Sequence, residues 1–104
     1  MKEITKFREW EELLDLEEFV IFVSKSSCNS CDIVEEDMRN LKFRNVFKIS
    51  LDNPESFNLR KEISWIRHKV EILPFFAFIS HGCIEKKFQG FEFKKALEFL
   101  HSRR

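Results

Sequence analysis

The sequence predicts an α/β fold in which a central mixed β-sheet is flanked by helices on both faces. Apolar runs suited to strands buried on both faces alternate with segments of helical periodicity through the first two thirds of the chain. One further apolar run and a mixed segment, residues 75–80 and 83–89, follow; a short turn with Gly82 separates them, as is typical of an antiparallel hairpin. The length of 104 residues suits one domain, residues 1–104.

The first part of the chain predicts a buried strand between two helices. Residues 4–7 form a possible short edge strand, and residues 8–16 carry apolar side chains at helical spacing. Residues 18–24, EFVIFVS, are a continuous apolar run, which indicates a strand buried on both faces. A helix is expected over residues 28–41, where apolar side chains again recur on one face. These apolar positions are Cys31, Val34, Met38 and Leu41.

The remainder predicts one more strand and helix, a hairpin and a terminal helix. Residues 45–52 are the next strand candidate, and residues 55–70 place apolar side chains on one helical face. Residues 75–80 and 83–89 are expected to form the hairpin, and a helix is expected from residue 93 to residue 100. Parallel strands joined by right-handed crossovers, followed by an antiparallel hairpin, give the mixed sheet.

Composition and charge exclude several classes of function. The formal net charge is zero, so nothing indicates general attraction to nucleic acid or membranes. The longest early apolar run, FVIFV, is far too short to cross a bilayer, and no secretory signal is visible. Three cysteines, an odd number, do not make a closed disulfide framework. We therefore expect a cytoplasmic monomer with no nucleic-acid and no membrane partner.

The stretch SSCNSCDIVEEDM, residues 26–38, carries the most informative pattern. Cys28 and Cys31 are three apart, directly after a buried strand and at the start of a helix that Ser26 and Ser27 can cap. Side chains three apart on a helix are neighbours, so a disulfide can close if Cys28 lies partly off the helix. It closes a very short loop, which constrains the unfolded chain little. The pair therefore suits opening and closing better than cross-linking.

The start of a helix also favours the thiolate form of a cysteine, because unpaired N–H groups and the helix dipole stabilise negative charge there. We expect Cys28 to be the attacking sulfur and Cys31, which faces the core, to resolve the mixed disulfide. The nearby acids Asp32 and Glu35 would oppose the dipole. The two residues between the cysteines can hydrogen-bond a sulfur and tune the motif: Asn29 and Ser30.

Other interpretations of the cysteines stay open at this point. Zinc usually takes four ligands, and the pair supplies two; the other candidate donors, His81 and Cys83, are expected at the far end of the sheet. The pair can also be two structural thiols. Redox exchange is favoured over both, because Cys-x-x-Cys beside a βαβ pattern is typical of it. No metal site is predicted, and Cys83 is expected to be a lone thiol.

Four features of the sequence together resemble the thioredoxin family over nearly the whole chain. They are FVIFVSKSSCNSC, FKISLDNPE, EILPFFAFISHGCIEKKFQGF and the terminal amphipathic helix. The resemblance implies a thioredoxin fold in which Leu73–Pro74 is a cis peptide facing the cysteines. It also implies that Gly90 leaves room for a substrate, and that Ser27, Leu73 and Pro74 complete a shallow substrate-binding surface.

The sequence departs from the family pattern around the cysteines. Phe22 stands where the family has a buried acid that helps to deprotonate the resolving thiol, so the base for Cys31 is in doubt. Lys48 matches a family lysine near that acid and is expected to be solvated without it. The other departures are Ser27 for tryptophan, Asn29-Ser30 for Gly-Pro, and Glu36 for a helix proline.

The sequence thus predicts a thiol–disulfide oxidoreductase that exchanges its Cys28–Cys31 pair with protein or small-molecule disulfides. It would need an external reductase or a small-molecule thiol to recycle it, and no organic cofactor or metal is implied. The alternative is a non-catalytic binding module on the same fold.

Overall fold

A five-stranded sheet in the order β1-β3-β2-β4-β5 organises the chain. The computed structural model describes residues 1–40 and 45–103. β1, β3 and β2 run parallel, β4 is antiparallel to β2, and β5 is antiparallel to β4, which confirms the predicted mixed sheet. The strands are β1 Lys2–Glu3, β2 Glu18–Ser24, β3 Val46–Ser50, β4 Phe75–Ser80 and β5 Cys83–Gln89.

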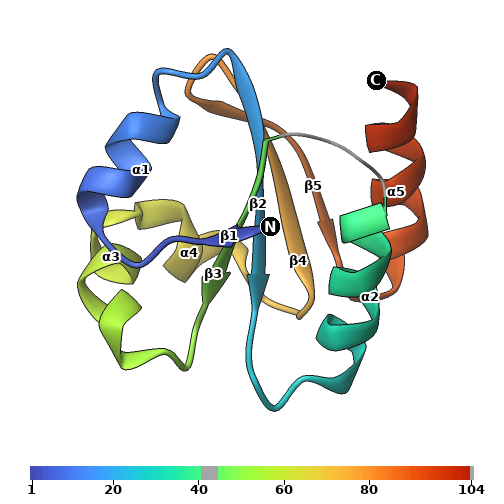
Figure 1. The fold of residues 1–104 in the computed structure, drawn as a ribbon, viewed down its shortest axis with the longest axis horizontal. Coiled ribbons are helices and arrows are strands. Elements are labelled where there is room, and N and C mark those ends of the chain that lie inside the picture. The colour runs from blue at the N-terminus through green and yellow to red at the C-terminus, as the bar shows by residue number, and fades with distance from the viewer. Residues whose placement is uncertain (41–44, 104) are drawn as a thin grey trace.

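Helices cover both faces of this sheet (Figure 1). The layer formed by α1, α3 and α4 lies on one face, and the layer formed by α2 and α5 lies on the other. Short 3-10 turns, η1 and η2, precede α3 and α5. The bounds are α1 Phe7–Leu13, α2 Asn29–Asn40, η1 Pro54–Ser56, α3 Phe57–Glu62, α4 Ser64–Lys69, η2 Gly90–Glu92 and α5 Phe93–Ser102.

The continuous apolar runs of the sequence arise because β2 and β4 are buried on both faces. Successive strand residues point to opposite sides of a sheet. In β2, Phe19, Ile21 and Val23 pack in the core under α1, α3 and α4, whereas Val20 and Phe22 pack under α2 and α5. β4 alternates in the same way. Both strands have the predicted bounds, 18–24 and 75–80.

The predicted edge strand at residues 4–7 is wrong in position. β1 is only Lys2–Glu3, although the N–H of the buried Ile4 still donates to the carbonyl of Lys48 at 2.8 Å. The chain then turns, because the carboxylate of Glu9 accepts the N–H groups of Thr5 and Lys6 and so caps α1. α1 also ends three residues before the predicted limit of residue 16, at Leu13.

The single helix predicted over residues 55–70 is also wrong. The structure has η1, α3 and α4, with a break at Ile63, whose backbone is extended (φ −87°, ψ 94°). Leu59, Ile63 and Ile66 are nevertheless all buried in one cluster. The apolar spacing therefore continues through the break, and neither Gly nor Pro marks it in the sequence.

The hairpin is confirmed at residues 75–80 and 83–89. His81 and Gly82 form its turn with φ of 51° and 80°, which matches a tight hairpin turn with two residues in the left-handed region. α2 is confirmed apart from its ends, and Leu41, the predicted last residue, lies outside the described residues. α5 extends two residues beyond the predicted limit of residue 100.

Candidate functional site

The segments that contain the predicted site residues lie together at one edge of the sheet. β2 and β3 end there, β4 begins there, and β5 returns to it (Figure 1, lower edge). The strand register fixes this meeting, because Phe75 pairs with Val23 on one side and with Gln89 on the other. The segments that follow or precede these strands are residues 25–28, 51–53, 71–74 and 90–92, which therefore lie at the same edge.

Cys28 and Cys31 are joined by a disulfide at the start of α2. As predicted, Cys28 lies just before the first helical residue and is half-buried, whereas Cys31 is in the first turn and only 1% exposed. The N–H of Cys31 donates to the Sγ of Cys28 at 3.1 Å. The hydroxyl of Ser30 lies 3.8 Å from the same sulfur, which is within reach of a hydrogen bond. The side chains of Asn29 and Ser30 are exposed.

Lys48 is not the solvated lysine that the sequence predicted. Its Nζ lies 2.7 Å from Oε1 of Glu35, and the two side chains are only 26% and 15% exposed. The other oxygen of Glu35 accepts from Arg39 at 2.8 Å. Two cations thus offset the negative charge of Glu35, which the sequence alone predicts to oppose a thiolate at Cys28. The sequence could not show this pairing, because Glu35 and Lys48 come from different elements.

Asp52 holds the loop that leads to Cys28. Its carboxylate accepts a hydrogen bond from the N–H of Ser26, which lies 3.1 Å from each of the two oxygens. It also accepts from the hydroxyl of Ser26 and, at 2.9 Å, from the hydroxyl of Ser50. These hydrogen bonds, led by the one from the Ser26 hydroxyl, lower the pKa of Asp52 from its ordinary value of 3.8 to about 2. The sequence predicts Ser26 only as a helix cap and gives no sign of this contact, which joins the segment after β3 to the loop before Cys28.

The loop before β4 faces the same edge. The Leu73–Pro74 peptide is cis, as the resemblance implied. The side chain of Gln89 secures this loop by accepting the N–H groups of Glu71 and Ile72 at 2.9 and 3.1 Å. Pro74 is buried, and its carbonyl accepts the N–H of Gly90 at 2.8 Å. Within the described residues, no hydrogen bond engages the main chain of Leu73.

Leu73 also connects this loop to the cysteines. Its half-buried side chain packs against both core clusters, one of which contains Cys31 and Phe76, the residue opposite Phe22 in the sheet. Cys28 packs against that same cluster. Ser27 is exposed on the preceding loop. Phe22 itself is fully buried and stacks against Phe76, with ring centroids 5.1 Å apart. No carboxylate therefore occupies the place of the family acid.

A side chain at Gly90 would collide with Ile72 as that residue is placed here. The φ of Gly90 is +56°, and a Cβ there would meet Cγ2 of Ile72 at 2.9 Å. Two large apolar residues beside it, which the sequence analysis did not select, are open to solvent: Ile72 is 57% exposed and Phe91 is 100% exposed. In the sequence they are marked only by their positions, with Ile72 two residues before Pro74 and Phe91 directly after Gly90.

The structure separates the candidate metal donors. Cys83 and His81 lie at the hairpin turn, next to Ser80, which pairs with Glu18 at the amino end of β2, whereas Cys28 follows its carboxyl end. Among the described residues, no three His, Cys, Asp or Glu side chains are grouped to hold a metal ion. Cys83 is an exposed free thiol.

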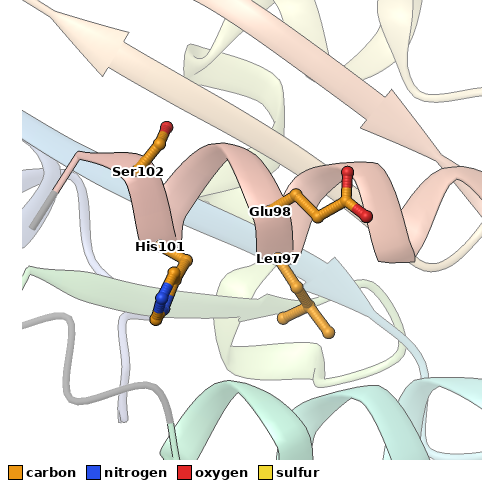
Figure 2. A pocket seen from close by; sticks show the side chains of 4 residues that line it. All are labelled: Leu97, Glu98, His101 and Ser102. Carbon is orange, nitrogen blue, oxygen red and sulfur yellow. The ribbon is translucent and has the colours of Figure 1, made fainter.

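A shallow surface hollow lies on the last turns of α5 and does not belong to this edge. It is lined by Leu97, Glu98, His101 and Ser102, with a volume of about 340 Å³. Figure 2 shows Leu97 and His101 on one side of the helix and Glu98 and Ser102 on the other. These turns lie toward the C-terminus, away from the start of α2 (Figure 1).

No helix in the part of the chain that the structure describes combines the length and the apolar character needed to cross a membrane. No protein-family model matches the sequence, and no curated protein sequence matches it significantly.

Comparison with solved structures finds thioredoxins. The Malassezia sympodialis thioredoxin Mala s 13 aligns with a TM-score of 0.76 at 15% identity, covering 98% of this chain and 89% of that one. The germline-specific thioredoxin Deadhead of Drosophila melanogaster aligns with a TM-score of 0.75 at 21% identity, covering 98% of each chain. A chain of the complex of ferredoxin:thioredoxin reductase with thioredoxin f2 aligns with a TM-score of 0.73 at 18% identity, covering 99% and 94%. The predicted thioredoxin fold is therefore confirmed.

Proposed function

We propose that this chain, which has the thioredoxin fold, is a thiol–disulfide oxidoreductase that works through Cys28 and Cys31. One observation carries the proposal: the half-buried Sγ of Cys28 lies at the start of α2 and accepts the N–H of Cys31 at 3.1 Å. In the reduced protein the same N–H and the helix dipole would favour a thiolate at Cys28. The thiolate is the nucleophile in disulfide exchange.

The exchange balances without any cofactor. The Cys28 thiolate attacks one sulfur of a substrate disulfide, a mixed disulfide forms, and the other substrate sulfur leaves as a thiolate that takes a proton from water. Cys31 then loses its proton and attacks the sulfur of Cys28. The second substrate thiol is released, and the Cys28–Cys31 disulfide remains. Two electrons have passed from the protein to the substrate.

The loops around the pair offer a surface for the substrate. We assign substrate contact to Ser27, Leu73 and Gly90, and a supporting role in the same surface to Pro74. The free main chain of Leu73 is available to pair with an extended peptide. Because Pro74 is buried and its carbonyl is already bonded to Gly90, its contribution is to hold Leu73 in place. The exposed Ile72 and Phe91 add apolar area next to it.

The oxidised pair needs a reductant, for which we propose an external reductase or a small-molecule thiol. The complex of thioredoxin f2 with ferredoxin:thioredoxin reductase supports a reductase for a chain of this fold. Cytoplasmic location and the monomeric state stay predictions. Titration of the pair against glutathione buffers separates two directions of electron flow: a potential near −270 mV, roughly that of thioredoxin, favours a reductant, and one of about −120 to −180 mV favours an oxidant or isomerase.

Insulin reduction in the presence of dithiothreitol tests the activity. The assay uses a Cys83→Ser background, because Cys83 is an exposed thiol that can itself react. The protein should accelerate insulin precipitation over dithiothreitol alone, and Cys28→Ser should abolish the acceleration. A protein that reduces no insulin and yet binds peptides would support the second candidate, a non-catalytic binding module. The replacement of the family acid by Phe22, fully buried here, is the observation that favours that candidate.

A further inference from the structure

A second surface hollow lies between α3 and α4 and is dominated by cations. Its volume is about 300 Å³, and its lining residues are Phe57, Arg60, Lys61 and Arg67. The break at Ile63 separates α3 from α4 and brings Arg67 of the second helix to the same hollow as Arg60 and Lys61 of the first. Three positive side chains therefore converge where the sequence predicted one continuous helix.

These cations have no acidic partners within the described residues. The ion pairs found there involve Lys2, Arg39, Lys48, His81 and Arg103. Arg60 has one long hydrogen bond, from Nε to the carbonyl of Ser56 at 3.4 Å. Lys61 and Arg67 are exposed. Isolated surface cations are ordinary, but three of them around one hollow form a local positive field that attracts anions.

An aromatic ring lies among the cations. Phe57 is 54% exposed, and its ring centroid is 5.7 Å from the guanidinium carbon of Arg60 and 5.1 Å from Nζ of Lys61. These cation–π contacts hold the charged groups beside the ring. The hollow thus presents positive charge and apolar surface together. Its chemical complement is a carboxylate-rich segment that also carries an apolar side chain.

We propose that this hollow docks an acidic segment of the protein with which the Cys28–Cys31 pair exchanges. Carboxylates would pair with Arg60, Lys61 and Arg67, the arginines in bidentate geometry, while an apolar side chain packs on Phe57. Only the identity of the partner rests on the proposed redox function; the binding itself does not.

A protein segment fits the hollow better than a small anion does. Exposed ion pairs contribute little individually, so a single inorganic anion would be held weakly, whereas a segment adds several such contacts to an apolar one. A short stretch of chain connects the hollow to the edge of the sheet where the cysteines lie. Phe57 begins α3 just after η1, and Asp52, before η1, holds Ser26 of the cysteine loop. A partner docked at the hollow would keep its disulfide at a raised effective concentration near Cys28.

Binding is testable on the oxidised full chain without turnover. The probe is a fluorescein-labelled peptide of alternating Asp and Glu with one central Phe, and the matched peptide replaces the acids with Asn and Gln. Anisotropy should show that only the acidic peptide binds and that added salt weakens this binding, and the amide chemical shifts of residues 57–69 should change.

The double variant Lys61→Glu with Arg67→Glu should weaken binding about tenfold or more, because each reversal replaces an attraction with a repulsion. The control, Lys94→Glu with Lys95→Glu on exposed sites of α5, makes the same change in net charge and should alter the Kd less than about twofold.

Equal weakening by the two double variants would overturn the docking site and leave only general charge attraction. So would shifts confined to other residues, or pyrophosphate binding at residues 57–69 more tightly than the peptide. None of these outcomes touches insulin reduction by the Cys28–Cys31 pair, so failure of the docking site and failure of the redox function remain distinct results.

Discussion

Nζ of Lys48 on β3 lies 2.7 Å from Oε1 of Glu35 on α2. Lys48 is the strand partner of Phe22, the residue that replaces the family acid, and Glu35 follows Cys31 by one helical turn. The lysine has thus kept an acidic partner although the acid in β2 is absent. The partner comes from α2, the helix that begins within the cysteine pair, and ties that helix to the sheet.

Removing this partner should destabilise the protein. Glu35→Gln leaves Lys48, which is only 26% exposed, without a counter-charge, and also removes the partner of Arg39. We expect a loss of about 1 kcal/mol in the free energy of unfolding, measured in urea, because the pair is more shielded than an ordinary surface pair. The control is Glu36→Gln, an exposed position on the same helix, which should change stability by less than about 0.5 kcal/mol. Equal effects of the two variants would show that the pair contributes nothing.

The link between Asp52 and Ser26 should respond to pH. The pKa of Asp52 falls from 3.8 to about 2 in the folded protein, so its stabilising effect is complete above pH 3.8 and is lost as the pH falls through about 2. The amide signal of Ser26 should therefore titrate with a midpoint near 2. Ser26→Ala should move the midpoint of Asp52 back toward 3.8, and Asp52→Asn should abolish the titration at Ser26. A midpoint that Ser26→Ala leaves unchanged would rule out the Ser26 hydroxyl as the main cause.

Gly90 and Gly82 offer a matched comparison. Both have positive φ, but a Cβ on Gly90 would meet Ile72 at 2.9 Å, whereas a Cβ on Gly82 would meet nothing within 4 Å. Gly82→Ala should cost about 1 kcal/mol from backbone strain alone, and Gly90→Ala should cost more, about 2 kcal/mol. Adding Ile72→Ala should recover part of the loss in Gly90→Ala and none in Gly82→Ala. Equal losses for the two alanine variants, by thermal or urea unfolding, would show that the contact with Ile72 is easily relieved.

The sequence predicts those elements of the fold that are determined by residues close together in the chain. β2, β4 and β5 follow from short-range apolar patterns and turn chemistry, so their bounds are correct. The break at Ile63 is invisible because its side chain keeps the apolar spacing of a continuous helix.

The same limit applies to the site. The exposure difference between Cys28 and Cys31 follows from their places at the start of one helix and was predicted. The pairing of Glu35 with Lys48 and that of Asp52 with Ser26 join residues distant in sequence, so they depend on the strand order and register. The pattern of apolar residues within one helix or strand does not show which residues of another element it will contact.

Trapping of the mixed disulfide tests most directly the claim that Cys28 attacks and Cys31 resolves. In a Cys83→Ser background, reduced Cys31→Ser is mixed with a peptide disulfide and analysed by intact mass, and reduced Cys28→Ser is treated in parallel. We expect a stable adduct of one peptide on Cys28 in the first variant and far slower adduct formation in the second, whose remaining thiol is 1% exposed. Equal rates of adduct formation in the two variants, or an adduct on Cys31 alone, would contradict the roles assigned to the two cysteines.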